Sequence, residues 1–123
     1  MTPPARPVRP ARYALISRPE VSADILALAV HGPEIVTATA TLLDDLTHGR
    51  VTGKPLGDRQ ISGDLTGLAR IKFDLPGQRP QRYRLLYRQL PNTTTLEIIA
   101  IGPRRQHAIY QLAVSRLMPE HPI

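Results

Sequence analysis

The spacing of apolar residues in the first half of the chain predicts a short strand followed by two helices. An apolar run over residues 13–16 fits the strand. Val21, Ile25 and Leu28 then follow at helical spacing, and a second such stripe runs to residue 46. The members of the second stripe are Ile35, Thr39, Leu42 and Leu46, with Val36 and Leu43 beside them. These two segments predict a helical hairpin.

Turn and capping residues mark where these helices begin and end. Ser17 with Glu20 three residues later fits a capping box at the start of the first helix. Gly32-Pro33 ends that helix, and Pro33 can open the next one, because its missing N–H is not needed in a first turn. Gly49 closes the second helix.

The second half of the chain changes to the alternation of β-strands. Residues 50–67 are rich in glycine and turn formers, and we expect a loop. Alternating apolar and polar positions predict strands over 68–74 and 81–90, joined by a hairpin loop over 74–81. A third strand over 94–101 is apolar on both faces, which favours a central position, and Gly102-Pro103 stops it.

A last helix completes the predicted fold. Its apolar stripe consists of Tyr110, Ala113, Val114 and Leu117. The order of elements is β-α-α-β-β-β-α, which indicates an α+β domain. The three strands of the meander carry cations on a common side, so we expect the helices to cover the other side.

Composition narrows the class of protein. We expect a disordered tail over residues 1–11, which hold four prolines, followed by a single domain over 12–123. With no cysteine, the chain forms no disulfide and no thiolate metal site, which suits a reducing cytoplasm. No apolar run is long enough to span a membrane, and the tail lacks the apolar core of a secretory signal. We therefore expect a cytoplasmic protein without membrane contact.

Charge is distributed unevenly along the chain. The net charge is +6, but residues 19–48 carry five acids and no Lys or Arg. Residues 49–123 carry twelve bases and five acids. A basic half of this kind indicates a polyanionic partner, although a solvated basic surface would show the same balance.

Several cations and one phenol fall where the predicted sheet can bring them together. Arg70 and Lys72 share one face of a strand, roughly 7 Å apart. The other members of this group are Arg84, Arg104 and Tyr110, with Arg88, Arg105, Lys54 and Arg59 as further candidates for RNA contact. Clustered cations repel one another, so a bound anion such as phosphate gives the group a purpose.

The residue types limit the chemistry of such a site. The four histidines, at 31, 48, 107 and 121, show no metal-ligand spacing, and no glycine-rich nucleotide loop is present, so we expect neither metal nor cofactor. RNA supplies its own nucleophile, the 2′-OH. Cleavage then needs a base, cations that stabilise the charge on phosphorus, and an acid for the leaving 5′ oxygen. Arg, Lys and Tyr can fill these roles if crowding shifts their pKa values.

The segments ARIKFD, YRLLYR, EIIAIGPR and AIYQLAVSRL, in that order, resemble the C-terminal half of RelE toxins. The resemblance covers roughly residues 65–117. It implies a RelE/ParE-like fold and the toxin half of a type II toxin–antitoxin pair. It further implies an endoribonuclease that cuts messenger RNA in the ribosome, inhibits translation and is neutralised by an antitoxin.

The resemblance also implies individual roles. Lys72 falls on the lysine suggested as general base, and Arg84 and Arg104 fall on arginines that bind the phosphate. Tyr110 falls on a tyrosine that stacks on a base and orients the nucleophile. Arg70 stands where these enzymes usually have a lysine. Arg keeps the charge but does not readily release a proton, so it serves only if that position stabilises charge.

Other interpretations of the same residues remain. The chain can be a ParE-like toxin that binds DNA gyrase without catalysis, or an RNA-binding remnant that lacks activity. Arg70 and Lys72 can form an ordinary solvated strand face. Tyr110 can belong to the core stripe of its helix, and Arg88 can pair with Glu97 across the sheet.

Overall fold

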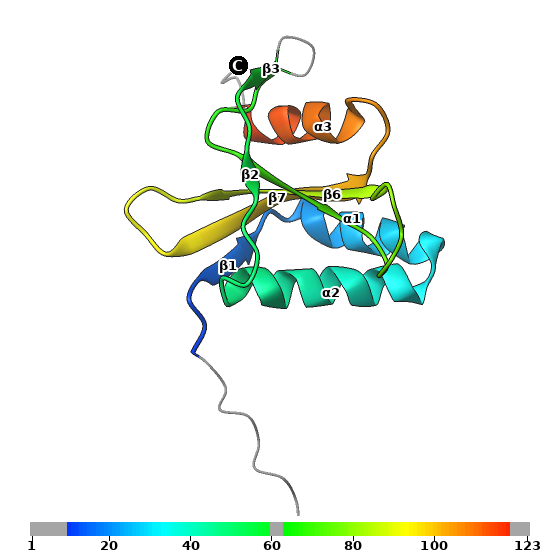
Figure 1. Ribbon diagram of the computed structural model, residues 1–123. Coiled ribbons are helices and arrows are strands. Elements are labelled where there is room, and N and C mark those ends of the chain that lie inside the picture. The colour runs from blue at the N-terminus through cyan, green and yellow to red at the C-terminus, as the bar shows by residue number, and fades with distance from the viewer. Residues whose placement is uncertain (1–9, 60–62, 119–123) are drawn as a thin grey trace, which may run out of the picture.

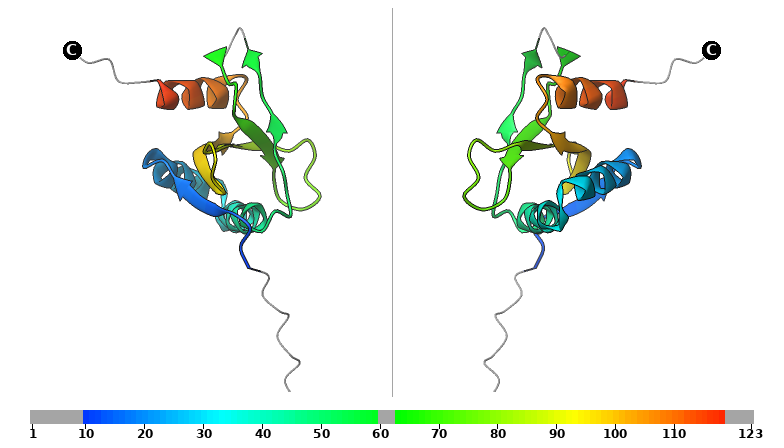
Figure 2. Two further views of the ribbon diagram at one scale, coloured as in Figure 1. Left: turned by 90° about the vertical axis from the view of Figure 1, so that its left-hand side faces the viewer. Right: turned by 90° about the vertical axis from the view of Figure 1, so that its right-hand side faces the viewer.

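The computed structural model describes residues 10–59 and 63–118 and places them in three layers. The middle layer is a five-stranded sheet, with the order β1-β7-β6-β5-β2. Two helices, α1 (Glu20–Leu28) and α2 (Pro33–Thr47), lie on one side of it, and α3 (Ala108–Leu117) lies on the other (Figures 1 and 2). The chain is thus an α+β protein, as its hydrophobic pattern predicts.

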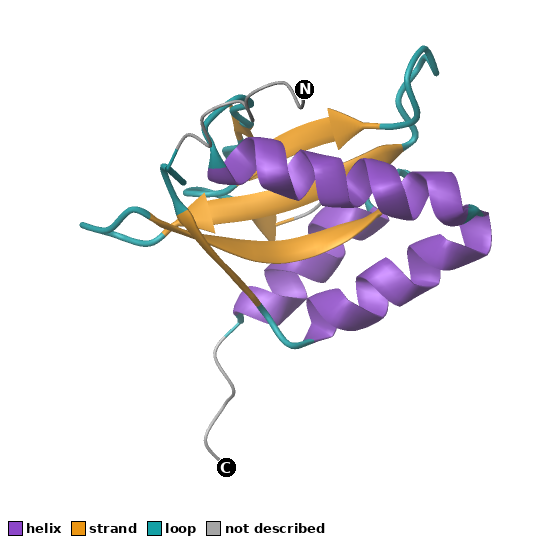
Figure 3. Ribbon diagram, turned by 90° about the horizontal axis from the view of Figure 1, so that it is seen from below, coloured by secondary structure: helices purple, strands orange, loops and turns teal. Residues whose placement is uncertain are grey.

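The helical hairpin follows the predicted stripes closely. Ile35, Thr39, Leu42 and Leu46 are all buried on α2. Gly32, with φ at +114°, precedes Pro33, which opens α2. A one-turn helix, η1 (Ala29–His31), joins α1 to α2, so that the two helices meet at one end (Figures 1 and 3). The apolar face of the hairpin packs on the sheet because both surfaces lose water there.

The capping box predicted at Ser17 is wrong. Ser17 is the last residue of β1 (Ala14–Ser17), where it pairs with Ile98. The helix cap is Pro19, without a side-chain hydrogen bond, and the chain is tied down by the Arg18 N–H, which donates to the Ile98 carbonyl. Ser17 therefore does not cap the helix, because it belongs to the strand that pairs with β7.

The meander consists of β5 (Ala69–Phe73), β6 (Tyr83–Gln89) and β7 (Thr95–Pro103), in antiparallel register. β7 lies between β6 and β1, which runs parallel to it, so the predicted central position is confirmed. The register shifts by one residue after Leu86. Gly102 and Pro103 do not stop β7 but form its last two residues.

The segment predicted as a loop over 50–67 contains three short strands. β2 (Lys54–Pro55) pairs with β5 at the edge of the sheet, and β3 (Asp58–Arg59) pairs with β4 (Gly63–Asp64). Gly53 ahead of β2 is buried, and its N–H donates to the Tyr87 hydroxyl at 2.8 Å. A Cβ there would meet the Tyr87 ring at 2.7 Å, so the glycine permits this close approach.

The sheet has a core on each face. The face toward α1 and α2 buries Phe73, Leu85, Ile98 and Ile101. The face toward α3 buries a second cluster, which comprises Leu56, Leu65, Leu68, Leu86, Ile99, Ala100, Ile109, Tyr110 and Ala113. The expectation that the helices lie only opposite the cations is therefore wrong for α3, which packs on the cationic face. The predicted tail over 1–11 lies mostly outside the described residues.

Candidate active site

Strand register brings the predicted cations together on the α3 face of the sheet. Lys72 on β5 stands directly opposite Arg84 on β6, and directly opposed residues of an antiparallel pair point to the same face. Arg70 lies two residues before Lys72 and shares that face. Arg84 in turn pairs with Gly102 on β7, two residues before Arg104.

Helix α3 adds the phenol. Nη1 of Arg70 donates to the Tyr110 hydroxyl at 3.3 Å, across 40 residues of sequence. The same hydroxyl is a hydrogen-bond partner of Arg84 that acts to raise the pKa of that arginine. Tyr110 is only 5% exposed, because its ring belongs to the core under α3. We name the group Arg70, Lys72, Arg84, Arg104 and Tyr110 the basic cluster.

Arg84 is a buried cation. It is 4% exposed, and its Nη1 donates to the carbonyls of Gln81 and Tyr83 at 2.8 and 2.9 Å. Its Nε has no hydrogen-bond partner. Burial is the main cause that lowers the pKa of Arg84, and the positive charges of Arg104 and Arg70 lower it further. The burial of this charge therefore reduces the folding free energy that the rest of the core contributes.

Lys72 is exposed and lies beside Arg84, its cross-strand partner. The positive charge of Arg70 is the largest cause that lowers its pKa, followed by that of Arg84. Its ordinary value is 10.5, so the shift raises the fraction of neutral amine at every pH near and below that value. A neutral amine is the form that can accept a proton, so the neighbours of Lys72 favour a role as base.

Arg104 lies exposed in the loop that joins β7 to α3. Its N–H donates to the Arg82 carbonyl, which holds the start of this loop beside β6. Its charge acts on both Lys72 and Arg84. Among the described side chains, no carboxylate forms an ion pair with any cation of the basic cluster.

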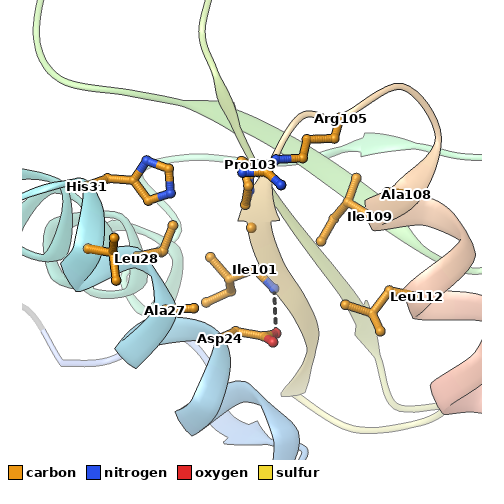
Figure 4. A pocket seen from close by; sticks show the side chains of 12 residues that line it. Asp24, Ala27, Leu28, His31, Ile101, Pro103, Arg105, Ala108, Ile109 and Leu112 are labelled. Carbon is orange, nitrogen blue, oxygen red and sulfur yellow. Dashed lines mark hydrogen bonds between the residues drawn. The ribbon is translucent and has the colours of Figure 1, made fainter.

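The other predicted RNA contacts are placed differently. Lys54, on edge strand β2, is exposed opposite Arg70 and lies next to the cluster. Arg88 pairs with Glu97 at 2.7 Å, as one interpretation of the sequence expects. Arg105 lies beyond the cluster, where it lines a cavity between α1 and α3 (Figure 4). Arg59 belongs to β3, but its side chain is outside the described part.

The sequence does not reveal the ion pair that helps to hold α3 against the sheet. Arg116 on α3 pairs with Asp24 on α1 through two hydrogen bonds of 2.6 and 2.8 Å, and both side chains are almost buried, at 11% and 10% exposure. Asp24 also accepts the Ile101 N–H, and Arg116 donates to the Ile99 carbonyl. The partners are 92 residues apart, so no local pattern indicates the pair.

The described part of the chain offers neither a metal-binding cluster nor a membrane-spanning helix. Across residues 10–59 and 63–118, no three His, Asp or Glu side chains lie close enough to hold a metal ion together. None of the helices described has both the length and the apolar character that a membrane crossing requires.

Comparisons with known proteins find similarity at the level of the fold. No family model matches the chain, and no curated protein matches its sequence. A mutant of the E. coli toxin RelE in the free state superposes with a TM-score of 0.55 at 20% identity, over 87% of this chain and 99% of the toxin. A chain of the RelBE2 toxin–antitoxin complex of Mycobacterium tuberculosis gives 0.53 at 26% identity, over 76% and 99%. The isolated E. coli RelE toxin gives 0.51 at 20% identity, over 86% and 99%. The chain therefore has the fold of the RelE-type toxins.

Proposed function

We propose that this chain is the toxin of a type II toxin–antitoxin pair and a metal-independent endoribonuclease that cuts messenger RNA in the ribosome. The observation that carries the proposal is the basic cluster, in which cations from two strands and a loop meet a phenol from α3. Cations without a carboxylate partner do not stabilise a fold, and the burial of Arg84 destabilises it further. An RNA phosphate supplies the missing negative charge.

The placement of the side chains suggests a division of roles. Neutral Lys72 takes the proton of the 2′-OH, and the 2′ oxygen attacks phosphorus. The P–O5′ bond breaks, which leaves a cyclic phosphate and a 5′-OH whose proton comes from water. Arg70 and Arg104 contact the phosphate oxygens as charge builds on them. Arg70 stabilises charge without releasing a proton, so the arginine at this position is compatible with activity.

Arg84 and Tyr110 are buried, so we assign them roles that act through their neighbours. Because both are buried, we assign Arg84 to the positive field under the phosphate and to the lowered pKa of Lys72. We assign Tyr110 to the orientation of Arg70, through the hydrogen bond between them. The base stacking that the resemblance implies for Tyr110 needs an accessible ring, whereas Tyr110 is only 5% exposed.

The test is a cell-free translation reaction in which the ends of the message are mapped. We expect cuts in phase with codons from the wild type and a large loss of these cuts in Lys72→Met. Arg50→Ala is the matched control, because it removes a surface cation that pairs with Asp44 and Asp45 on α2. Intact message together with gyrase-trapped broken DNA would favour a ParE-like toxin instead.

The antitoxin is the second part of the proposal. One solved neighbour is a toxin–antitoxin complex, and another is a mutant of E. coli RelE in complex with an antitoxin peptide, with a TM-score of 0.50 at 20% identity. We propose that a small protein encoded beside this chain binds it and covers the basic cluster. Co-expression of that protein should abolish toxicity, and unchanged toxicity would contradict the pairing.

A further inference from the structure

A cavity of about 410 Å³ opens between α1, the free edge of β7 and α3 (Figure 4). Its walls are apolar and comprise Leu28, Ile101, Ile109 and Leu112. Its polar groups are few: Asp24, His31 and Arg105. Pockets of roughly 300–1,000 Å³ with apolar walls and a few polar groups are typical sites for small organic ligands.

The cavity continues the basic cluster. Gly102, which lines it, is the direct cross-strand partner of Arg84. The chain then passes through Pro103 to Arg104 and Arg105, which are both exposed. Arg104 belongs to the basic cluster, whereas Arg105 lines the cavity. Two consecutive arginines thus connect the cluster to the cavity along the chain.

The edge of β7 at this cavity is not open to an added strand. β1 covers β7 only from Thr95 to Ile98. Beyond that point, the Ile101 N–H donates to Asp24 and the Ile99 carbonyl accepts from Arg116. Because these two edge groups are already satisfied, the cavity suits an inserted flat group better than a β-strand.

We propose that this cavity is a nucleobase subsite, which receives the base next to the phosphate held at the basic cluster. This inference rests on the proposed ribonuclease function and adds a source of sequence preference to it. The apolar walls take the faces of an unstacked base, and the Arg105 guanidinium donates to acceptors on its edge. Arg105 is therefore a specificity residue, which explains why it lies apart from the cluster.

A binding experiment tests the cavity independently of cleavage. The four nucleoside 3′-monophosphates are titrated into the full ¹⁵N-labelled chain, and amide shifts are followed by NMR. We expect at least one nucleotide to shift the amides of Gly102 and Ile109, as well as those near Lys72. Shifts confined to the region of Lys72 with all four nucleotides would overturn the proposal.

Two variants fill the cavity from opposite walls. Ala27 on α1 and Ala108 on α3 are exposed and line it, so Ala27→Leu and Ala108→Leu narrow it without disturbing the core. Ala40→Leu is the matched control, on an exposed position of α2 outside the cavity. Thermal melts verify that each variant folds. Each filling variant should lose the cavity shifts and keep those near Lys72, and retention of the cavity shifts in both would contradict the proposal.

Cleavage supplies the second readout. In this assay, ribosomes are programmed with messages that differ only in the nucleotides flanking the cut. We expect the wild type to prefer one base, and Ala27→Leu to reduce that preference by about tenfold, with little change on the poorer messages. An unchanged preference in both filling variants would overturn the base subsite although cleavage itself persists. A wild type that does not cut would overturn the ribonuclease function instead, and the nucleotide titration would still decide the cavity.

A protein partner is the remaining occupant to distinguish. If Ala27→Leu abolishes binding of the cognate antitoxin and leaves every nucleotide shift in place, the cavity serves that protein and the proposal fails. Arg105→Gln sharpens the assignment, because it keeps a hydrogen-bond donor without the charge. We expect it to weaken discrimination between bases more than overall cleavage, and an equal loss on all messages would contradict a specificity role.

Discussion

Two regions of the molecule treat charge in opposite ways. Around α2 and the loop between β5 and β6, Arg50 pairs with Asp44 and Asp45, and Arg82 pairs with Asp74. On the side of α3, the cations of the basic cluster have no carboxylate partner among the described side chains. The paired charges serve the fold, and the unpaired ones are available to a ligand.

The largest expected difference concerns Lys72. Lys72→Met should lower the cleavage rate about 10²–10⁴-fold, because it removes the proposed base. It should leave the free energy of unfolding almost unchanged, since Lys72 is exposed and repelled by its neighbours. Quantitative end mapping and urea unfolding measure the two effects. Loss of stability equal to that of a core variant would show that Lys72 belongs to the fold.

The opposite outcome is expected for the Asp24–Arg116 pair, which joins α1 to α3. Arg116→Met leaves Asp24 almost buried without its partner, and breaking such a pair costs about 3–5 kcal/mol of folding free energy. Asp24→Asn/Arg116→Met, which removes both charges, should recover part of that loss. Urea unfolding of the wild type, the single variant and the double variant measures it. A double variant no more stable than the single one would contradict a cost that arises from the unpaired charge.

Much of this arrangement could be predicted from the sequence, because the hydrophobic period defines buried faces. The four residues of the α2 stripe are all buried, and strand alternation places Arg70 and Lys72 on one face. The capping box failed because Ser17 belongs to β1, where it pairs with Ile98 of β7, about 80 residues further along the chain. Local motifs yield to long-range pairing in such cases.

The site was harder to predict than the strands. Alternation alone brings Lys72 and Arg84 together, but the burial of Arg84 and Tyr110 depends on the side of the sheet that α3 covers. The hydrophobic period of α3 predicts which residues of the helix are buried, but it does not predict which face of the sheet the helix covers. The Asp24–Arg116 pair, which helps to hold α3 in place, joins residues with no shared local pattern.

Arg84 offers the sharpest contrast between stability and activity. Arg84→Met replaces a buried cation, whose Nε lacks a partner, with an apolar side chain of similar length. We expect the variant to be more stable by about 1 kcal/mol, at the low end of what replacement of buried charge yields, and to cleave more slowly. Thermal and urea unfolding measure the gain. A clear loss of stability would mean that the bonds to the Gln81 and Tyr83 carbonyls outweigh the cost of burial.

Acid should affect the paired charges around α2 and the loop between β5 and β6. Hydrogen bonds from Arg82 are the main cause that lowers the pKa of Asp74 from 3.8 to about 2. A carboxyl group with a lowered pKa in the folded state contributes stability that is complete above its unfolded value and is lost as the pH falls through the folded value. Asp74→Asn should therefore reduce the difference in stability between pH 5 and pH 2, followed by urea unfolding. An unchanged pH dependence would remove Asp74 from the acid response.

The smallest effect is a shift in the pH dependence of cleavage. If Lys72 is the base, the rate rises with pH as the amine loses its proton, and the position of this rise follows the pKa of Lys72. Arg70 is the largest cause that lowers this pKa, so Arg70→Gln should let it return toward 10.5 and move the rise to higher pH. Arg50→Gln is the control, since Arg50 pairs with Asp44 and Asp45 and lies outside the basic cluster. Single-turnover rates on programmed ribosomes, at several pH values below 10, measure the shift. A rise that stays in place in Arg70→Gln while the rate falls would mean that Arg70 acts on the phosphate alone, and the two regions would then differ in ligand binding but not in proton transfer.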